Sequence, residues 1–230
     1  MSAYGFDAVV FDLDGTLVDS IPDVIGAMNR VLTEHGRRAI TLDEGRTMVG
    51  EGAAALIQRA FAATGAPPQS AAVDILVRRY LEWYRQFPAA ESTVFPGVAE
   101  TLRELRAAGV ALGVCTNKPH EMVAPVLDGL GLSGFFTSAL GAGALSVRKP
   151  DPAHMHAVIE AIGGARDSAA YVGDGPTDCE AARAANLPIV LVTYGYTRVP
   201  VRELKADAYI DRFADLPDAL RTLARETVRG

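Results

Sequence analysis

The chain has 230 residues, of which 49% are hydrophobic and 22% are charged, and its formal net charge is −6. This composition is that of a globular protein, and the length fits one large domain or one domain with a smaller insertion. The acidic balance argues against a protein that binds nucleic acid through charge alone, although an anionic small substrate can still meet a locally positive site.

Cysteine and histidine usage excludes two further classes. The two cysteines, Cys115 and Cys179, are too few for a disulfide framework and predict buried free thiols. The four histidines form no H-E-x-x-H pattern and no C-x-x-C is present, so a zinc site is not expected. The sequence shows no signal-peptide pattern and no apolar run long enough to span a membrane. We therefore expect a cytoplasmic protein with no membrane partner.

The first part of the chain predicts one strand followed by helices. An apolar run leads into residues 7–12, which we expect to form a buried strand. The helix after it would be capped by Asp19 or Ser20. Residues 41–44 have the form of a capping box for a second helix. Apolar residues at helical spacing then predict that residues 20–90 are helical throughout, with no strand.

From about residue 95 the chain alternates between apolar strands and helices. The predicted strands are residues 110–116, 135–140, 169–173, 188–193 and 208–210, and the predicted helices are residues 98–109, 119–130, 152–162, 178–185 and 216–227. Such alternation indicates an α/β fold with a Rossmann-like parallel sheet covered on both faces. The helical block would then be an insertion after the first strand, at the sheet edge where a lid is useful.

Two carboxylates, Asp12 and Asp14, end the first predicted strand, and Gly15 follows them. Residues i and i+2 of a strand point to the same side, so both carboxylates can face one point from about 6–7 Å apart. Like charges that close are unfavourable unless a cation lies between them, and Mg²⁺ is the usual cation in phosphate chemistry. An acidic turn is the plainer interpretation, but open α/β sheets bind ligands at the C-terminal ends of their strands, which favours a functional site.

Three later stretches end at the same edge of the predicted sheet. Thr116 and Asn117 can donate to a phosphoryl oxygen, although a helix N-cap would also explain them. Lys149 precedes a helix that begins with proline, which would give its side chain a fixed direction of approach. The plainer interpretation is that Lys149 is an ordinary solvated charge. Asp174 and Asp178 form a second acidic strand end, where metal ligation by Asp174 competes with a plain helix-capping arrangement.

Together these stretches resemble the four motifs of the haloacid-dehalogenase-like superfamily of aspartate-nucleophile phosphatases. The matching residues are Asp12-x-Asp14-Gly15-Thr16-Leu17-Val18-Asp19-Ser20 for motif one, Thr116-Asn117 for motif two, Lys149-Pro150 for motif three and Gly173-Asp174-x-x-x-Asp178 for motif four. The helical block resembles the α-helical cap of these enzymes. The resemblance therefore implies a core domain of residues 1–19 and 91–230 and a cap domain of residues 20–90.

The residue chemistry supports the mechanism that this resemblance implies. Asp12 would attack phosphorus to give an aspartyl-phosphate, and Asp14 would protonate the leaving alkoxide and then activate the hydrolytic water. Thr116 and Lys149 would hold the phosphoryl oxygens as charge develops. The implied ligands of Mg²⁺ are Asp12, Asp14 through its backbone carbonyl, and Asp174, with Asp178 in support. The substrate-binding residues would be Thr16, Gly50, Asn117 and Lys149, and Thr16 would also orient Asp14.

Within the superfamily the chain most resembles the phosphoglycolate phosphatases. The supporting stretches are residues 49–52, 116–119, 149–152 and 192–196. Gly175 departs from the serine that relatives often carry, which removes one possible hydroxyl contact. The implied reaction is hydrolysis of 2-phosphoglycolate, whose carboxylate could meet Arg46, Arg59, Lys118 or a helix N-terminus near residues 50–52.

Two other functions are compatible with the sequence. A related phosphatase or phosphomutase for a sugar phosphate, a nucleotide or pyrophosphate would carry the same motifs, because these fix phosphoryl transfer and leave the organic part of the substrate open. A signalling receiver domain also uses a strand-end aspartate, a threonine and a lysine, but needs neither a second aspartate two residues on nor a helical insertion. The chain could be a monomer or a homodimer.

Overall fold

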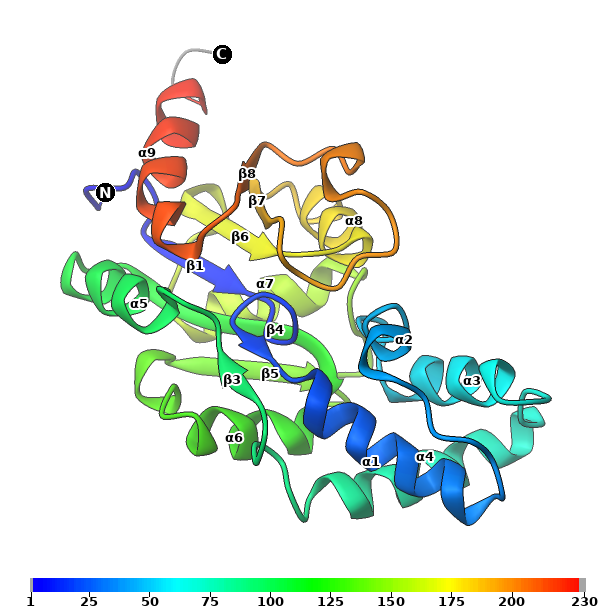
Figure 1. The fold of residues 1–230 in the computed structure, drawn as a ribbon. Coiled ribbons are helices and arrows are strands. Elements are labelled where there is room, and N and C mark those ends of the chain that lie inside the picture. The colour runs from blue at the N-terminus through cyan, green and yellow to red at the C-terminus, as the bar shows by residue number, and fades with distance from the viewer. Residues whose placement is uncertain (1, 228–230) are drawn as a thin grey trace.

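A parallel six-stranded sheet lies at the centre of the computed structural model, which describes residues 2–227. The strands follow the order β5-β4-β1-β6-β7-β8 (Figure 1). Their bounds are Ala8–Phe11 (β1), Ala111–Pro119 (β4), Ser138–Ala142 (β5), Ala169–Gly173 (β6), Ile189–Val192 (β7) and Ala208–Ile210 (β8). The predicted α/β fold class with a Rossmann-like sheet is confirmed. Because the chain winds outward in both directions from β1, the ligand-binding position of such sheets lies at the C-terminal end of this strand.

The pleat of the strands sends alternate residues into two hydrophobic layers. In β1, Val9 and Phe11 face one layer, whereas Ala8 and Val10 face the other. The first layer is covered by Val98–Ala107 (α5), His120–Gly129 (α6) and Leu216–Thr227 (α9), and the second by Pro152–Ala161 (α7) and Pro176–Ala184 (α8). Burial on both faces explains why β1 and β7 are uniformly apolar.

Four further helices lie between β1 and β4 in the chain and form what we call the helical segment. They are Ile21–Glu34 (α1), Leu42–Arg46 (α2), Ala53–Ala63 (α3) and Ser70–Tyr84 (α4). These helices pack against one another beyond the C-terminal ends of the strands, at the lower right of Figure 1. The predicted capping box is confirmed, because the Thr41 hydroxyl accepts from the Glu44 N–H and the Glu44 carboxylate accepts from the Thr41 N–H.

At the ends of this segment, one feature was not predicted and one prediction is wrong. Val18–Asp19 (β2) and Thr93–Val94 (β3) pair as antiparallel strands, and two residues are too few to give a periodic signal. Ser20 occupies the N-cap of α1 but does not cap it, because its backbone is in the helical region and its hydroxyl donates to Asp14 instead. The Asp19 carboxylate accepts a long hydrogen bond, 3.4 Å, from the Ile21 N–H, and shorter ones from the Tyr196 hydroxyl and Arg46.

Three element boundaries also differ. Strand β4 continues to Pro119 instead of ending at residue 116, because it keeps pairing with β5 after an irregularity in register. A 3₁₀ turn, Ser133–Phe135, precedes β5, which delays the start of that strand. Helix α8 begins at Pro176, since proline is favourable in a first helical turn where no N–H donor is needed.

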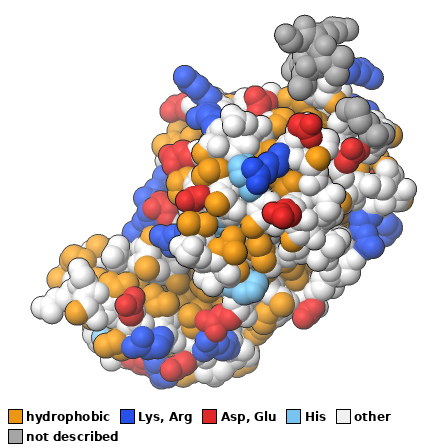
Figure 2. Space-filling view, turned by 180° about the vertical axis from the view of Figure 1, so that it is seen from behind, with side chains coloured by type: hydrophobic (Ala, Val, Ile, Leu, Met, Phe, Trp, Pro, Cys, Tyr) orange, Lys and Arg blue, Asp and Glu red, His pale blue; other side chains and the backbone are white. Residues whose placement is uncertain are grey.

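The surface and the thiols agree with the composition. On the face seen in Figure 2, Lys and Arg side chains are interspersed with Asp and Glu. Both cysteines are buried free thiols, as predicted. Within residues 2–227, no helix combines the length and the apolar character of a membrane span.

A buried carboxylate joins the two ends of the helical segment. Asp23, in the first turn of α1, accepts hydrogen bonds from the backbone N–H groups of Glu91 and Ser92 and from the Ser92 hydroxyl. Only 8% of this residue is exposed. Because β2 and β3 pair at the same place, the chain's entry into the segment and its exit are fixed together.

We expect the Asp23→Ala variant to lose about 2–3 kcal/mol of unfolding free energy, since it removes a charged acceptor and leaves several donors unpaired. Urea unfolding measures the change. Glu160→Ala, on the exposed side of α7, is the control and should stay within about 0.5 kcal/mol of the parent chain. Equal stability of the two variants would contradict the role of Asp23.

Candidate active site

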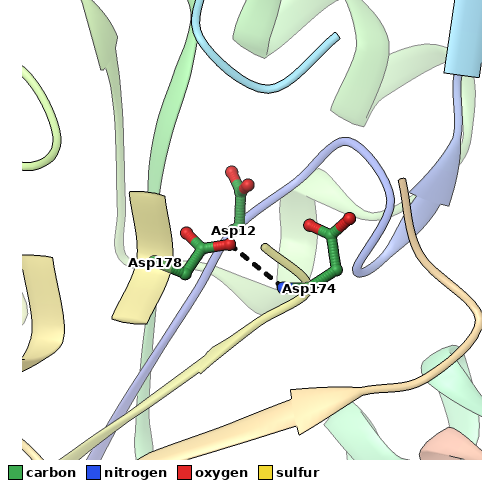
Figure 3. A group of neighbouring side chains, drawn as sticks. All are labelled: Asp12, Asp174 and Asp178. Atoms are coloured by element: carbon green, nitrogen blue, oxygen red, sulfur yellow. Dashed lines mark hydrogen bonds between the residues drawn. The ribbon is translucent and has the colours of Figure 1, made fainter. Parts of the chain in front are cut away.

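Three aspartates meet at the C-terminal ends of β1 and β6. Asp12 follows β1, Asp174 follows β6, and Asp178 lies in the first turn of α8. One carboxylate oxygen of each lies within 4.8 Å of the others, and all three residues are buried (Figure 3). The structure thus brings together the three acidic side chains that the sequence placed on two separate strand ends.

Asp178 holds the other residues of this cluster in place. Its Oδ2 accepts from the N–H groups of Asp174 at 3.0 Å and Gly175 at 3.1 Å (the first is the dashed line in Figure 3). A Cβ on Gly173 would lie 2.4 Å from the Asp178 side chain, so the close approach of strand and helix requires glycine there. Asp178 therefore supports the cluster through the backbone of Asp174.

Lys149 places an ammonium among these carboxylates. Its Nζ lies 2.7 Å from Asp178 Oδ1, 3.1 Å from Asp12 Oδ1 and 2.8 Å from the Tyr171 hydroxyl. Its side chain is 1% exposed, so the alternative of a solvated surface charge is wrong. Burial alone would lower the pKa of Lys149, but Asp12 and Asp178 outweigh it and hold the pKa above its ordinary value. The side chain therefore remains a cation.

Negative charge still exceeds positive charge in the cluster. Burial raises the pKa of Asp12 to about 6 although Lys149 lowers it, and burial with the charges of Asp178 and Asp12 raises the pKa of Asp174 well above its usual range. Three buried carboxylates beside one ammonium are unfavourable without a further cation. An all-oxygen ligand set with excess negative charge fits a hard divalent cation. The residues present can therefore hold such a metal.

Asp14 has different partners from those predicted. The Ser20 hydroxyl donates to its Oδ1 at 2.6 Å, and Lys118 Nζ lies 2.9 Å from the same oxygen. Thr16 was expected to orient Asp14, but its hydroxyl donates to Asp174 Oδ1 at 3.3 Å. The tight turn after Asp14 folds Thr16 toward β6, which corrects that prediction.

Thr116 and Asn117 are buried residues within β4, and neither caps the helix that follows, whose N-cap is Pro119. The Asn117 amide donates to the Lys149 carbonyl at 3.1 Å and to the Gly50 carbonyl at 3.4 Å. It thereby links two strand-end loops to the helical segment. The Oδ1 atom of Asn117 is buried and has no hydrogen-bond partner among the described residues.

A small cavity lies between the strand ends and the helical segment. The strand ends contribute the polar wall, which includes Asp12, Asp14, Thr116, Asn117 and Lys118. The helical segment contributes mainly apolar and phenolic groups, which include Val24, Val49, Leu56, Tyr80 and Tyr84. Among the predicted substrate-binding residues, Gly50 and Asn117 line this cavity, whereas Thr16 and Lys149 are buried beside the aspartate cluster.

Two of the cations predicted as possible carboxylate partners are engaged elsewhere. Arg46 Nη2 lies 3.1 Å from Asp19 Oδ2. Arg59 forms an ion pair with Glu51 and donates to the Met48 carbonyl at 3.0 Å. Neither arginine belongs to the cavity lining, whereas Lys118 does.

Several residues that hold the site together were missed from the sequence. Ser20 belongs to motif one, but the sequence pattern assigned it to helix capping. Tyr171 lies inside an apolar strand, and the sequence pattern indicates no role for its hydroxyl group. Tyr84 reaches Lys118 from another part of the chain, and no local signal links the two. Only the long-range fold brings these side chains to the aspartates.

The fold and this site define a class of parallel α/β proteins whose acidic residues follow the first and fourth strands of the core sheet in chain order. A family model described as haloacid dehalogenase-like hydrolase matches residues 6–186. The chain therefore belongs to the haloacid dehalogenase-like hydrolases, as the sequence motifs predicted.

Individual relatives agree with this family. The chain is 44% identical over 215 residues to a phosphoglycolate phosphatase of Caulobacter vibrioides, covering 94% of this chain and 91% of that protein. It is 43% identical to a phosphoglycolate phosphatase of Rhodospirillum rubrum, covering 93% and 90% of the two chains. A crystal structure described as a predicted phosphoglycolate phosphatase from Haemophilus somnus superposes with a TM-score of 0.85 at 32% identity, covering 93% of this chain and 97% of that one. The predicted enzyme class, a phosphoric monoester hydrolase similar to these proteins, is confirmed, and the receiver-domain alternative is wrong.

The charge excess in the cluster predicts a stabilising substitution. In excess chelator at pH 7.5, Asp174→Asn should raise the free energy of unfolding by about 1–3 kcal/mol, because it removes an uncompensated buried carboxylate. A carboxyl whose pKa is higher in the folded state lowers stability as pH rises above its unfolded value. The gain should therefore vanish as pH falls toward about 4, near the unfolded pKa. Urea unfolding across pH measures it, with the exposed Asp167→Asn as control. A less stable Asp174→Asn protein at pH 7.5 would contradict the charge balance.

Proposed function

We propose that this chain is a Mg²⁺-dependent phosphatase that hydrolyses 2-phosphoglycolate to glycolate and phosphate through an aspartyl-phosphate on Asp12. The observation that carries the proposal is the buried Asp12 carboxylate, which lines the cavity beside Asp14 and contacts the Lys149 ammonium. The names of the relatives at 44% and 43% identity support the substrate.

Asp12 is the proposed nucleophile. Its Oδ1 accepts from the Leu13 N–H at 2.8 Å and lies 3.1 Å from Lys149 Nζ, so two donors hold the carboxylate in one orientation. A carboxylate oxygen of Asp12 attacks phosphorus while the bond from phosphorus to the ester oxygen breaks. Thr116 and Lys149 stabilise the charge that develops on the phosphoryl oxygens.

Asp14 is the proposed acid and base. Its proton goes to the leaving ester oxygen of glycolate, and the resulting carboxylate then takes a proton from the water that attacks the phosphorus of the aspartyl-phosphate. That attack breaks the bond between the phosphoryl group and Asp12 and regenerates both carboxyl groups. The contacts with Ser20 and Lys118 support this role, since they hold the side chain in the cavity wall.

Asp12, Asp174 and the backbone carbonyl of Asp14 are the proposed ligands of Mg²⁺, and Asp178 and Thr16 hold Asp174. When bound, the ion would neutralise the excess negative charge and polarise the phosphoryl group. The buried carboxylates of Asp12, Asp174 and Asp178, which lie close enough together to hold one ion, support this assignment.

The helical segment is proposed to act as the cap domain, with residues 20–90 as its extent and residues 1–19 and 91–230 as the core domain. It supplies the apolar wall of the cavity and would exclude water from the reaction. Two buried free thiols support a cytoplasmic location. We predict that the protein is a monomer or a homodimer.

We expect Asp12→Asn to lower kcat by at least about 10³-fold, because the amide neither attacks phosphorus nor supplies a full charge to the metal. Steady-state phosphate release measures the loss, with folding checked by thermal unfolding. Substantial activity in a verified Asp12→Asn preparation would reject the mechanism.

Activity should require Mg²⁺, disappear in excess chelator and return when Mg²⁺ is restored, while Ca²⁺ should inhibit because its coordination is larger and looser. Mg²⁺ at about 100 times its dissociation constant should also add about 2.7 kcal/mol of stability, which thermal unfolding detects without turnover. This stabilisation should be lost in Asp174→Asn and kept in Asp167→Asn. Full activity in excess EDTA would overturn the metal assignment.

Among small phosphate esters, 2-phosphoglycolate should have the highest kcat/KM, since the relatives at 44% and 43% identity are named phosphoglycolate phosphatases. The panel contains hexose phosphates, nucleoside monophosphates and pyrophosphate. If any of these exceeds 2-phosphoglycolate tenfold, a difference of about 1.4 kcal/mol in transition-state stabilisation, the substrate assignment is wrong while the family stands.

A further inference from the structure

Lys118 places an ammonium in the wall of the cavity, at the junction of the strand ends and the helical segment. Its side chain is 1% exposed. The Nζ atom donates to both carboxylate oxygens of Asp14, at 2.9 and 3.2 Å, and to the Tyr84 hydroxyl at 2.6 Å. The same atom lies 4.8 Å from the centroid of the Tyr84 ring. These contacts fix one positive charge between β4 and α4.

We propose that Lys118 recognises the carboxylate of the substrate and thereby selects small phosphate esters that carry a second anionic group. This inference rests on the proposed function, because it gives the carboxylate of 2-phosphoglycolate its partner in the protein. Lys118 then determines substrate specificity, in addition to contacting Asp14, the proposed acid and base.

The position of Lys118 beside Asp14 matches the covalent structure of the substrate. In 2-phosphoglycolate a single methylene group separates the ester oxygen from the carboxylate carbon. Asp14 must come within hydrogen-bond reach of that ester oxygen in order to protonate it. A cation that already contacts Asp14 is therefore within reach of the carboxylate as well. An ammonium has three N–H donors, so Lys118 can bind a substrate oxygen and still keep a contact with Asp14 or Tyr84.

The charge of the cavity wall leads to the same assignment. Among the described residues that line the cavity, Lys118 is the only cation, and Asp12 and Asp14 are the only acids. A substrate carboxylate buried here without a cation would lose its hydration and meet like charges. Val49 and Leu56 in the opposite wall offer no hydrogen bonds, and the polar side chains of that wall are the Tyr80 and Tyr84 hydroxyls. The single cation of the lining thus favours a substrate with a second anion.

Two substrates separate recognition of the carboxylate from support of Asp14. Ethyl phosphate has the same phosphate and a similarly short chain, but a methyl group replaces the carboxylate. Loss of support for Asp14 would reduce turnover of both substrates alike, because both need the same protonation of the ester oxygen. Loss of carboxylate recognition would affect 2-phosphoglycolate alone. The ratio of the two kcat/KM values therefore reports recognition.

The experiment measures this ratio in the parent enzyme with Mg²⁺ and in Lys118→Met. We expect the ratio to fall at least about tenfold in the variant, mainly through KM, since a buried charge-assisted hydrogen bond is lost. Lys118→Gln, which keeps a donor without the charge, gives a second reading if the methionine variant does not fold. The matched control is Arg59→Met, a cation of the helical segment outside the cavity, whose ratio should not change.

The outcomes distinguish this inference from the proposed function. If the parent enzyme shows no preference for 2-phosphoglycolate over ethyl phosphate, the proposed substrate is wrong and the inference falls with it. If the parent enzyme shows the preference and both Lys118 variants keep it, the substrate stands and Lys118 only positions Asp14. A ratio that falls in the Lys118 variants and not in Arg59→Met supports the inference.

Discussion

The organising interaction of this protein is the buried ammonium of Lys149 among carboxylates that follow two neighbouring strands. Asp12 and Asp178 both contact it, and Asp174 lies beside them with a pKa raised well above its usual range. One ammonium does not balance three buried carboxylates, so the cluster favours a divalent cation and an anionic substrate held on it. The parallel sheet makes this arrangement possible, because adjacent strands β1 and β6 end at the same edge.

The aspartate cluster and the helical segment depend on each other through two polar links. Asn117 joins the Lys149 carbonyl to the Gly50 carbonyl, and Lys118 joins Asp14 to Tyr84 of α4. Both links are buried, so breaking either one would leave polar groups without partners. The two links thereby hold the helical segment in a fixed position relative to the residues proposed to carry out the chemistry.

Much of the fold and the acidic site was predictable because both depend on local patterns. Apolar strands alternating with helices indicated the sheet, and acidic residues at the ends of the predicted strands 7–12 and 169–173 indicated the cluster. The rest depends on long-range packing. The turn after Asp14 carries Thr16 to Asp174 and brings Ser20 to Asp14, which spacing alone does not reveal. Likewise, the sequence offered three cations for the substrate carboxylate, and only the packing of the cavity singled out Lys118.

The central claim is that Asp12 becomes covalently phosphorylated during turnover. The most direct measurement is rapid acid quenching of the enzyme during hydrolysis of 2-phosphoglycolate, followed by intact-mass analysis and peptide mapping of the protein. We predict a transient species heavier by one phosphoryl group, with the added mass on the peptide that contains Asp12 and lost on mild base treatment, as an acyl phosphate requires. Turnover in which no phosphorylated protein forms at any quench time, or phosphorylation at a different residue, would contradict the account.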